Sequence, residues 1–163
     1  MISLALITAA TVTIMPTPSF AQNQFTAVLN GASVFPPVTT NATGKAVLDL
    51  IGNGQVMKYN VSGTNIKGSN VHTVVITHST GGRFTDLVSL RSGTQQGLTG
   101  NKTSGSMVGN FTSKDITGGG NIPGFKKDMP SLVKDIINGN VFVKVTSVKF
   151  PLGEIAGKLK SGP

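Results

Sequence analysis

The chain has 163 residues, no cysteine and no tryptophan, and its 14 lysines and arginines against six acidic residues leave a formal net charge of +8. The lack of cysteine excludes disulfides, thiol nucleophiles and thiolate metal ligands. With a single tyrosine the chain offers no aromatic stacking platform for single-stranded nucleic acid, so we expect no nucleic-acid partner in spite of the positive charge.

Residues 1–21 have the pattern of an export signal. The apolar run Ile2–Met15 has no charged side chain, and Ser19-Phe20-Ala21 places small residues before a cleavage site after Ala21. As a helix this run is about 21 Å long, whereas a membrane anchor must cross a hydrocarbon core of about 30 Å. We therefore expect a signal peptide over 1–21 and a single domain over 22–163, secreted or at the cell surface and not spanning a membrane after cleavage.

Short runs of alternating apolar and polar residues dominate the rest of the chain. Phe25-Ala27-Leu29, Ala46-Leu48-Leu50 and Met57-Tyr59-Val61 would each place apolar side chains on one face of an extended segment. Further runs of this kind are Val71–His78, Phe84–Leu90, Ser106–Thr112, Val141–Phe150 and Glu154–Leu159. Clusters of Gly, Pro, Asn and Ser separate them, so the sequence predicts an all-β sandwich or barrel of about eight strands.

One short helix is predicted near residues 130–138. Within Pro130–Ile137 the apolar residues recur at spacings of one and four, which is typical of one helical face. Pro130 stands near the first turn and Gly139 just beyond the end, and both positions favour a helix. We expect this helix to cover one open end of the sheets and the glycine-rich segment before it, 117–123, to form a flexible loop.

Two segments with proline and glycine at fixed positions frame the predicted strands. One is Pro36-Pro37-Val38 followed by Ala42-Thr43-Gly44, and the other is Phe150-Pro151-Leu152-Gly153-Glu154-Ile155. In this order and at this separation they resemble the CHRD (chordin-type) domain family over about residues 25–159. The resemblance implies an extracellular, immunoglobulin-like Greek-key sandwich or barrel, similar to copper–zinc superoxide dismutase. The family includes growth-factor-binding chordins and many secreted microbial proteins.

The chain departs from the family pattern at its imidazoles. The family's Ala-His-Ile-His stands here as Val71-His72-Thr73-Val74, so only the first histidine is kept. In the family's Val-Asn-Val-His-Thr, Lys144 and Thr146 replace the Asn and the His, and Ala156 stands where an Arg often follows Gly-Glu-Ile. A metal site held by these family positions would have lost most of its ligands.

His72 is the one candidate metal ligand that this comparison leaves. The second histidine of the chain, His78, would lie about 20 Å from it on a continuous strand. Zinc needs its ligands about 2 Å from one centre. We therefore expect no metal and no cofactor. We also expect no catalytic residues, because the sequence shows no closely spaced pair of carboxylates and no Gly-x-Ser-x-Gly motif. The alternative hypothesis, from a different functional class, is that the chain is a metal-dependent redox or hydrolytic enzyme on a dismutase-like scaffold.

A candidate interaction surface is predicted in the last two strands. Lys144 and Lys158 would supply positive charge there, with Thr146 and Glu154 beside them. The expected partner is an extracellular protein or a glycan, and a polyanion-binding protein is the third hypothesis. Glu154 has a structural alternative, because a carboxylate after a Pro-x-Gly turn can bond to backbone N–H groups or to a lysine. We expect the chain to act as a non-catalytic binding or structural module.

Four Asn-x-Ser/Thr sequons are present in the chain, at Asn41, Asn60, Asn101 and Asn110. Asn41 and Asn101 fall in predicted turns and are the candidate glycosylation sites. Asn60 and Asn110 fall within strand patterns, so they would qualify only if their side chains face outward.

Overall fold

The alternating runs form strands, and the all-β prediction is confirmed. The computed structural model describes residues 23–66, 71–90 and 104–162; the predicted signal peptide lies outside them. The strands are β1 (Gln24–Asn30), β2 (Thr43–Ile51), β3 (Val56–Thr64), β4 (Val71–Thr80), β5 (Arg83–Leu90), β6 (Gly105–Thr112), β7 (Val141–Ser147), β8 (Ile155–Lys158) and β9 (Lys160–Ser161). Two 3-10 turns, η1 (Gly31–Ser33) and η2 (Ser113–Asp115), follow β1 and β6.

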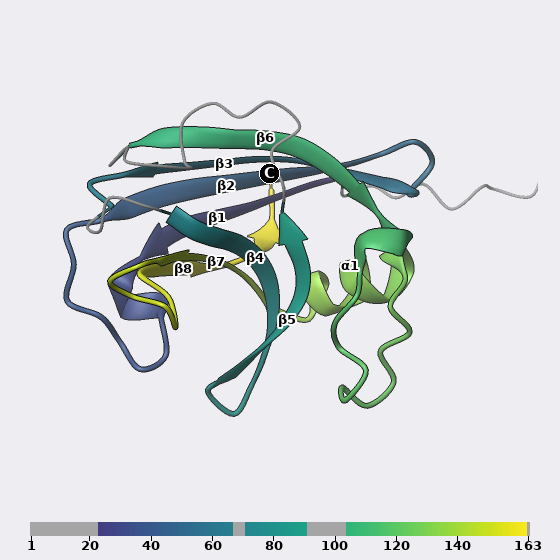
Figure 1. The fold of residues 1–163 in the computed structure, drawn as a ribbon. Helices are drawn as coiled ribbons and strands as arrows, with labels where there is room; N and C mark the ends of the chain where they lie inside the picture. Colours follow the sequence, from purple (N-terminus) through teal and green to yellow (C-terminus); the bar gives the residue numbers. More distant parts are fainter. Residues whose placement is uncertain (1–22, 67–70, 91–103, 163) are drawn as a thin grey trace, which may run out of the picture.

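All strands belong to one antiparallel sheet in the order β5-β4-β7-β8-β1-β2-β3-β6, with β9 paired to β1. The sheet curls on itself, so β6, β3, β2 and β1 lie over β8, β7, β4 and β5 (Figure 1). The result is a half-barrel whose two layers face each other across the apolar side chains of both. This arrangement follows from the alternation of apolar and polar residues along each strand, which gives every strand one apolar face to bury.

The sheet turns from one layer into the other between β8 and β1. Their register consists of one pair, Asn30 opposite Ala156. The next residue of β8, Gly157, lies against the backbone of β1: a Cβ built there would overlap the carbonyl oxygen of Val28 and lie 2.8 Å from its carbonyl carbon. A residue without a side chain is therefore what allows the two strands to approach at this joint.

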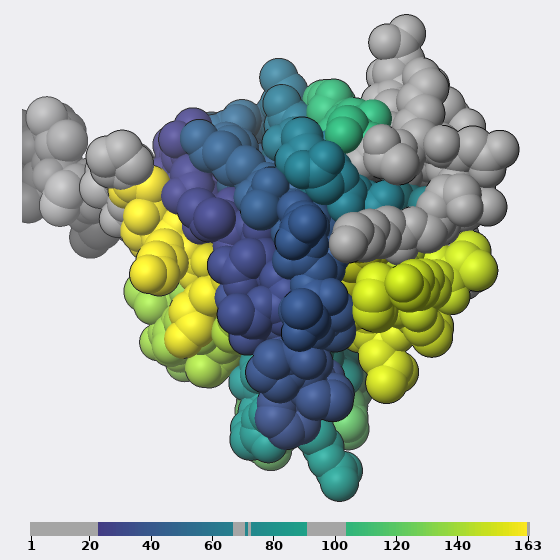
Figure 2. Space-filling view, turned by 90° about the vertical axis from the view of Figure 1, so that its left-hand side faces the viewer, coloured from purple at the N-terminus to yellow at the C-terminus, as the bar shows by residue number. Residues whose placement is uncertain are grey.

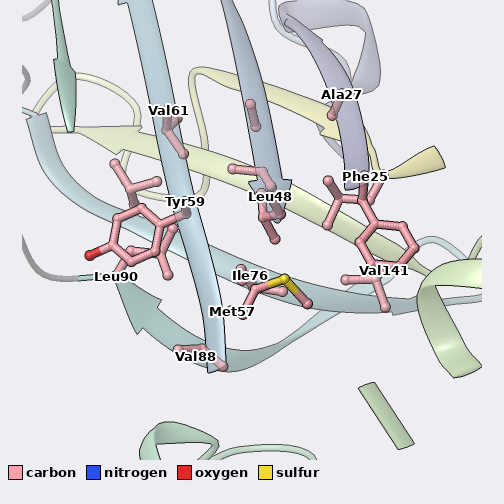
Figure 3. Packing of buried hydrophobic residues seen from close by; sticks show 14 of the residues in the cluster. Phe25, Ala27, Leu48, Met57, Tyr59, Val61, Ile76, Val88, Leu90 and Val141 are labelled. Atoms are coloured by element: carbon pink, nitrogen blue, oxygen red, sulfur yellow. The ribbon is translucent and has the colours of Figure 1, made fainter. Parts of the chain in front are cut away.

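The core lies between the layers and is continuous. Phe25 and Leu48 from one layer meet Ile76 and Val141 from the other in a single cluster of buried residues (Figure 3). Tyr59 packs near Phe111 with ring centroids 6.3 Å apart. Burial of these side chains supplies the main stabilisation of the fold, at roughly 25 cal/mol per Å² of apolar surface.

The predicted helix is confirmed as α1 (Met129–Ile137), which lies at one end of the layers in Figure 1. Leu132 and Ile136 are buried in the core cluster, whereas Ile137 is exposed. Asp128 caps its first turn by accepting a hydrogen bond of 2.8 Å from the backbone N–H of Ser131. The helix thus closes the end of the core through one apolar face.

The Asp128 cap predicts a pH-dependent contribution to stability. Two hydrogen bonds from Ser131 hold the pKa of Asp128 below its ordinary value, and the one from the side chain has a larger effect than the one from the backbone. The cap therefore stabilises the protein above the unfolded-state pKa, and this stabilisation is lost as pH falls through the folded-state pKa. We expect Asp128→Ala to cost about 1 kcal/mol at neutral pH and the difference from wild type to shrink in acid, as measured by urea unfolding across pH.

Asp128→Asn is the matched control, because asparagine caps a helix as well as aspartate and does not titrate. It should keep most of the neutral-pH stability. A difference between Asp128→Ala and wild type that stays constant from neutral to acid pH would contradict this account.

The glycine-rich segment before α1, predicted as a flexible loop, is held against β5. The backbone N–H groups of Thr117 and Gly118 both donate to the carbonyl oxygen of Leu87 at 3.1 Å. A Cβ on Gly118 would overlap the carbonyl oxygen of Asp86. The glycine therefore lets this segment run along the strand backbone.

Candidate interaction site

The outer face of β7 and β8 brings together the residues predicted for interaction. Val143 and Val145 of β7 point into the core, so Lys144 and Thr146 face outward. In the register between these strands, Lys144 lies opposite Ala156. Three of the positions at which the chain departs from the family pattern, Lys144, Thr146 and Ala156, thus lie on one face.

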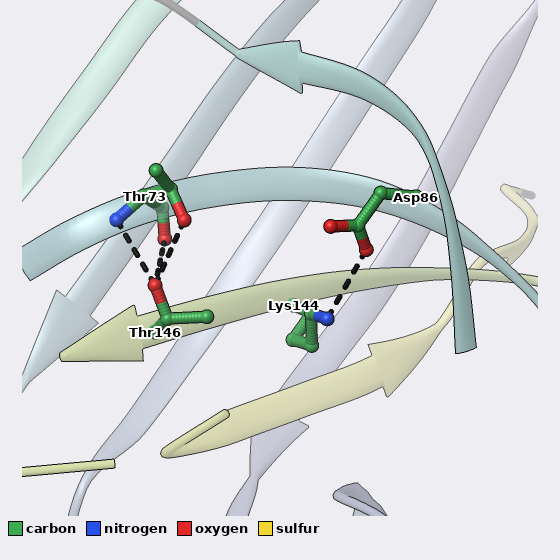
Figure 4. A network of polar contacts seen from close by, with 4 residues as sticks. All are labelled: Thr73, Asp86, Lys144 and Thr146. Atoms are coloured by element: carbon green, nitrogen blue, oxygen red, sulfur yellow. Dashed lines mark hydrogen bonds and ion pairs between the residues drawn. The ribbon is translucent and has the colours of Figure 1, made fainter. Parts of the chain in front are cut away.

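Lys144 is a nearly buried cation with one acidic partner. Its side chain reaches across β4, and its Nζ lies 3.1 Å from Oδ1 of Asp86 on β5 (Figure 4). The same Nζ is 5.7 Å from the centroid of the Phe84 ring. Lys144 is 8% exposed as a residue, whereas the side chain of Asp86 is 57% exposed. Water therefore reaches the acidic end of the pair much more than the basic end.

Thr146 is held by one threonine across the sheet, Thr73. Its Oγ1 accepts the backbone N–H of Thr73 at 3.0 Å and lies 2.8 Å from the Thr73 hydroxyl (Figure 4). Thr146 is buried. These contacts satisfy its hydroxyl within the chain.

Glu154 joins two segments that are distant in the sequence. Its backbone N–H donates to the carbonyl oxygen of Val145 at 2.8 Å, and its Oε1 accepts the Thr40 hydroxyl at 3.2 Å. The residue is fully buried. Glu154 therefore fastens the β1–β2 loop (residues 31–42) to the turn before β8. Its carboxylate does so by accepting a threonine hydroxyl, whereas the structural alternative names backbone N–H groups or a lysine.

Lys158 is the exposed member of the predicted set. Its Nζ lies 5.6 Å from the centroid of the Phe142 ring, and that ring meets Phe84 edge-on at 5.4 Å. The four predicted residues share an outer face, but Lys144, Thr146 and Glu154 are buried there. Their part in binding a partner stays a prediction, and Lys158 is the one directly accessible to it.

The structure describes the side chain of one of the two histidines, His78. His72 lies in β4 where its pairing with β7 shifts register between Val71 and Thr73, and its side chain is outside the described part. Val74, at the family's second histidine position, points into the core. His78 is buried at the end of β4, with Nε2 3.6 Å from Oδ2 of Asp135. Within residues 23–66, 71–90 and 104–162, the side chains that the structure describes include no group of three metal-ligating residues.

A second feature, which the sequence does not reveal, is an apolar patch at one end of the sandwich. The β1–β2 loop and the turn between β7 and β8 enclose a groove of about 230 Å³. It is lined by Pro36, Pro37, Val38, Phe150, Pro151 and Leu152, among others. The blue N-terminal segment and the yellow-green turn lie side by side on the surface in Figure 2. The two segments that carried the family resemblance thus form one site.

Large exposed apolar side chains stand in the groove lining or directly before it in the chain: Leu152 lines the groove, and Phe35 and Val148 precede the lining residues Pro36 and Lys149. Phe35 is 56% exposed, Val148 64% and Leu152 71%. We call these three residues and the groove the end patch. Phe35 rests on the β4–β5 hairpin, where its ring atoms lie 3.0 Å from the position of a Cβ on Gly82. An exposed apolar group of this kind is typical of a site that binds another molecule.

Basic side chains border the end patch. Lys149 lies in the same turn, with its Nζ 5.6 Å from the centroid of the Phe150 ring. Arg83 is exposed at the hairpin on which Phe35 rests. The carboxylate in the adjoining turn, Glu154, is buried. The described rim of the patch is therefore positive.

The described sequons all lie at the surface. Asn41 is exposed in the β1–β2 loop, and Asn60 and Asn110 are exposed on β3 and β6. The predicted site at Asn101 lies outside the described residues.

Comparison with known proteins identifies the family. The model of the CHRD domain matches residues 25–159, a range that includes both segments of the end patch and every described strand except the first residue of β1 and the short β9. No curated protein and no solved structure matches the chain. The chain belongs to the CHRD domain family.

Proposed function

We propose that the chain is an exported, non-catalytic module that binds an extracellular protein through the end patch. CHRD domains are generally non-catalytic, occur in extracellular proteins and serve in protein interaction. Within the described ranges, no helix has the length and apolar character needed to cross a bilayer. The proposed export rests on the pattern of residues 1–21.

The observation that carries the binding proposal is the exposure of Leu152, which lines the groove, together with that of Phe35 and Val148, which directly precede lining residues in the chain. Each side chain exposes more than half of its surface, although the fold has a continuous core in which apolar residues can be buried. Burying such a side chain on association would gain about 1.5–3 kcal/mol. Aromatic and aliphatic anchors of this size often dominate the binding energy of protein interfaces.

The rim of the patch indicates the chemistry of the partner. Lys149 and Arg83 carry positive charge beside the apolar side chains, and the whole chain has a net charge of +8. A complementary partner presents apolar side chains flanked by carboxylates. Such charges would speed the encounter and fix its orientation, while the apolar contacts would supply most of the affinity.

The test compares how much protein wild type and variants of the chain retain from the native extracellular fraction. Immobilised wild-type chain and Leu152→Asp are incubated with that fraction, and bound proteins are quantified by mass spectrometry. We expect Leu152→Asp to lower the recovery of the retained protein by about tenfold or more, the loss expected at a central apolar anchor. Ile137→Asp is the matched control, because Ile137 is 61% exposed on α1 and does not line the end groove.

Equal recovery by Leu152→Asp and Ile137→Asp, with both variants folded, would remove the end patch from the proposal. Metal analysis of the purified chain distinguishes the binding module from the alternative hypothesis, a metal-dependent enzyme. One equivalent of bound transition metal, lost on His72→Ala, would favour a metal-dependent enzyme instead.

A further inference from the structure

Two sequons lie on adjacent strands of the layer formed by β1, β2, β3 and β6, which we call the first layer. They are Asn60-Val61-Ser62 on β3 and Asn110-Phe111-Thr112 on β6. The middle residues, Val61 and Phe111, are buried in the core. Because side chains alternate along a strand, the asparagines must point to the opposite face, and both are exposed. The condition that strand positions must face outward is therefore met at both sites.

The register of the strands places these asparagines close together. Asn60 lies opposite Val108, and Asn110 lies opposite Lys58. They are therefore diagonal neighbours, about 7–8 Å apart on one face. Val108, which is 38% exposed, is a neighbour of both asparagines on this face, and β6 is the last strand of the sheet on this side among the residues that the structure describes.

We propose that this face carries N-linked glycan, at Asn60, Asn110 or both. The inference rests on the proposed export, because the sugar donor is a lipid-linked oligosaccharide at the membrane that the chain crosses. The side-chain nitrogen of asparagine forms a bond to the anomeric carbon of the donor. The bond from that carbon to the carrier phosphate oxygen breaks, the phosphate leaves with the electron pair, and the amide nitrogen loses one proton.

Transfer precedes folding of these strands. In the folded chain the Thr112 hydroxyl donates to Oδ2 of Asp115 at 3.1 Å, and the Ser62 hydroxyl lies 3.4 Å from the carbonyl oxygen of Lys45. Both sequon hydroxyls thus have partners in the fold. An extended chain during export presents Asn, the middle residue and the hydroxyl residue without those contacts.

Glycan on this face accounts for two features of the first layer. It covers the exposed Val108 and shields β6, which is an edge strand of the described sheet, and edge strands can pair with another chain. It also lies on the opposite layer from the outer face of β7 and β8, where Lys158 is exposed. The modified face and the face that exposes Lys158 then point in different directions.

The experiment expresses the full chain in a host that N-glycosylates its exported proteins. The chain is collected from the medium and its peptides are analysed by mass spectrometry. We expect the peptide containing Asn60 or Asn110 to carry a glycan mass, and Asn60→Gln or Asn110→Gln to remove the mass of the corresponding site. Asn121→Gln is the matched control, because Asn121 is exposed but is followed by Ile122-Pro123 and forms no sequon.

The outcomes separate this inference from the proposed export. Chain found in the medium with both asparagines unmodified overturns the inference and leaves export standing. Glycan at Asn41 in that same sample would show that the host machinery reached the chain. Chain retained inside the cell in its uncleaved form overturns export and the inference together.

Discussion

Alanine at Gly157 is expected to destabilise the fold by about 3 kcal/mol or more, although it adds only a single methyl group. The new Cβ would overlap the Val28 carbonyl oxygen and lie 2.8 Å from the Leu29 Cδ2. Gly157 sits in β8, which pairs with β7 on one side and meets β1 on the other. Neither neighbour can move without disturbing the joint between the two layers.

Gly120→Ala is the matched control for this variant. A Cβ there would come no closer than 3.5 Å to its nearest neighbour, the flexible end of Lys127. Alanine at an unstrained position reduces the entropy of the unfolded chain, so this variant should be neutral or up to about 1 kcal/mol more stable. Urea unfolding of both variants provides the measurement. Equal stability of the two would show that β8 and β1 separate at little cost.

The alternation of side chains made most of the strand faces predictable. In β3, the apolar residues Met57, Tyr59 and Val61 are all buried, and the polar residues between them are exposed, as period two requires. The helix was predictable because Pro130 and Gly139 mark its ends and its apolar residues share one face. These signals are local, since each depends on residues within one segment.

Strand β7 shows where local reasoning fails. Its alternation predicts one buried face and one solvent-facing face, but Lys144 and Thr146 on the outer face are buried too. The β1–β2 loop and the turn before β8 explain the burial of Lys144, and Thr73 of the neighbouring strand contacts Thr146. Val34 lies 3.0 Å, and the Lys144 stem 3.3 Å, from the Cβ position of Gly153. Coverage by a loop from the other end of the chain leaves no sign in the sequence of the strand itself.

The end patch could not be predicted for the same reason. Pro36-Pro37 and Phe150-Pro151 are each visible in the sequence, and their order supports the family resemblance. Only the closing of the sheet between β8 and β1 brings them to one groove. The short strand β9 escaped prediction because two residues, Lys160 and Ser161, are too few to show a period.

Lys144→Glu is expected to cost about 3 kcal/mol of stability, whereas Lys144→Met should stay within about 1 kcal/mol of wild type. Glutamate would place a second carboxylate beside Asp86 at a nearly buried position and would lose the contact with the Phe84 ring. Methionine would keep the apolar stem, and Asp86 would remain hydrated because its side chain is 57% exposed. The cost therefore comes from the burial of a like charge and not from the loss of the ion pair, which solvent screens at its acidic end.

Urea unfolding of Lys144→Met, Lys144→Glu and Lys158→Glu separates structural charge from surface charge. Lys158 is exposed, so Lys158→Glu should change stability by less than about 1 kcal/mol while lowering the salt at which the protein leaves an anionic resin. If Lys144→Glu is retained weakly on the anionic resin, partial unfolding explains the loss. The exception would be an equal loss of retention by Lys144→Met at wild-type stability. That last result would mean that the buried lysine contributes to an anion-binding surface after all, and it would overturn the structural role argued for it.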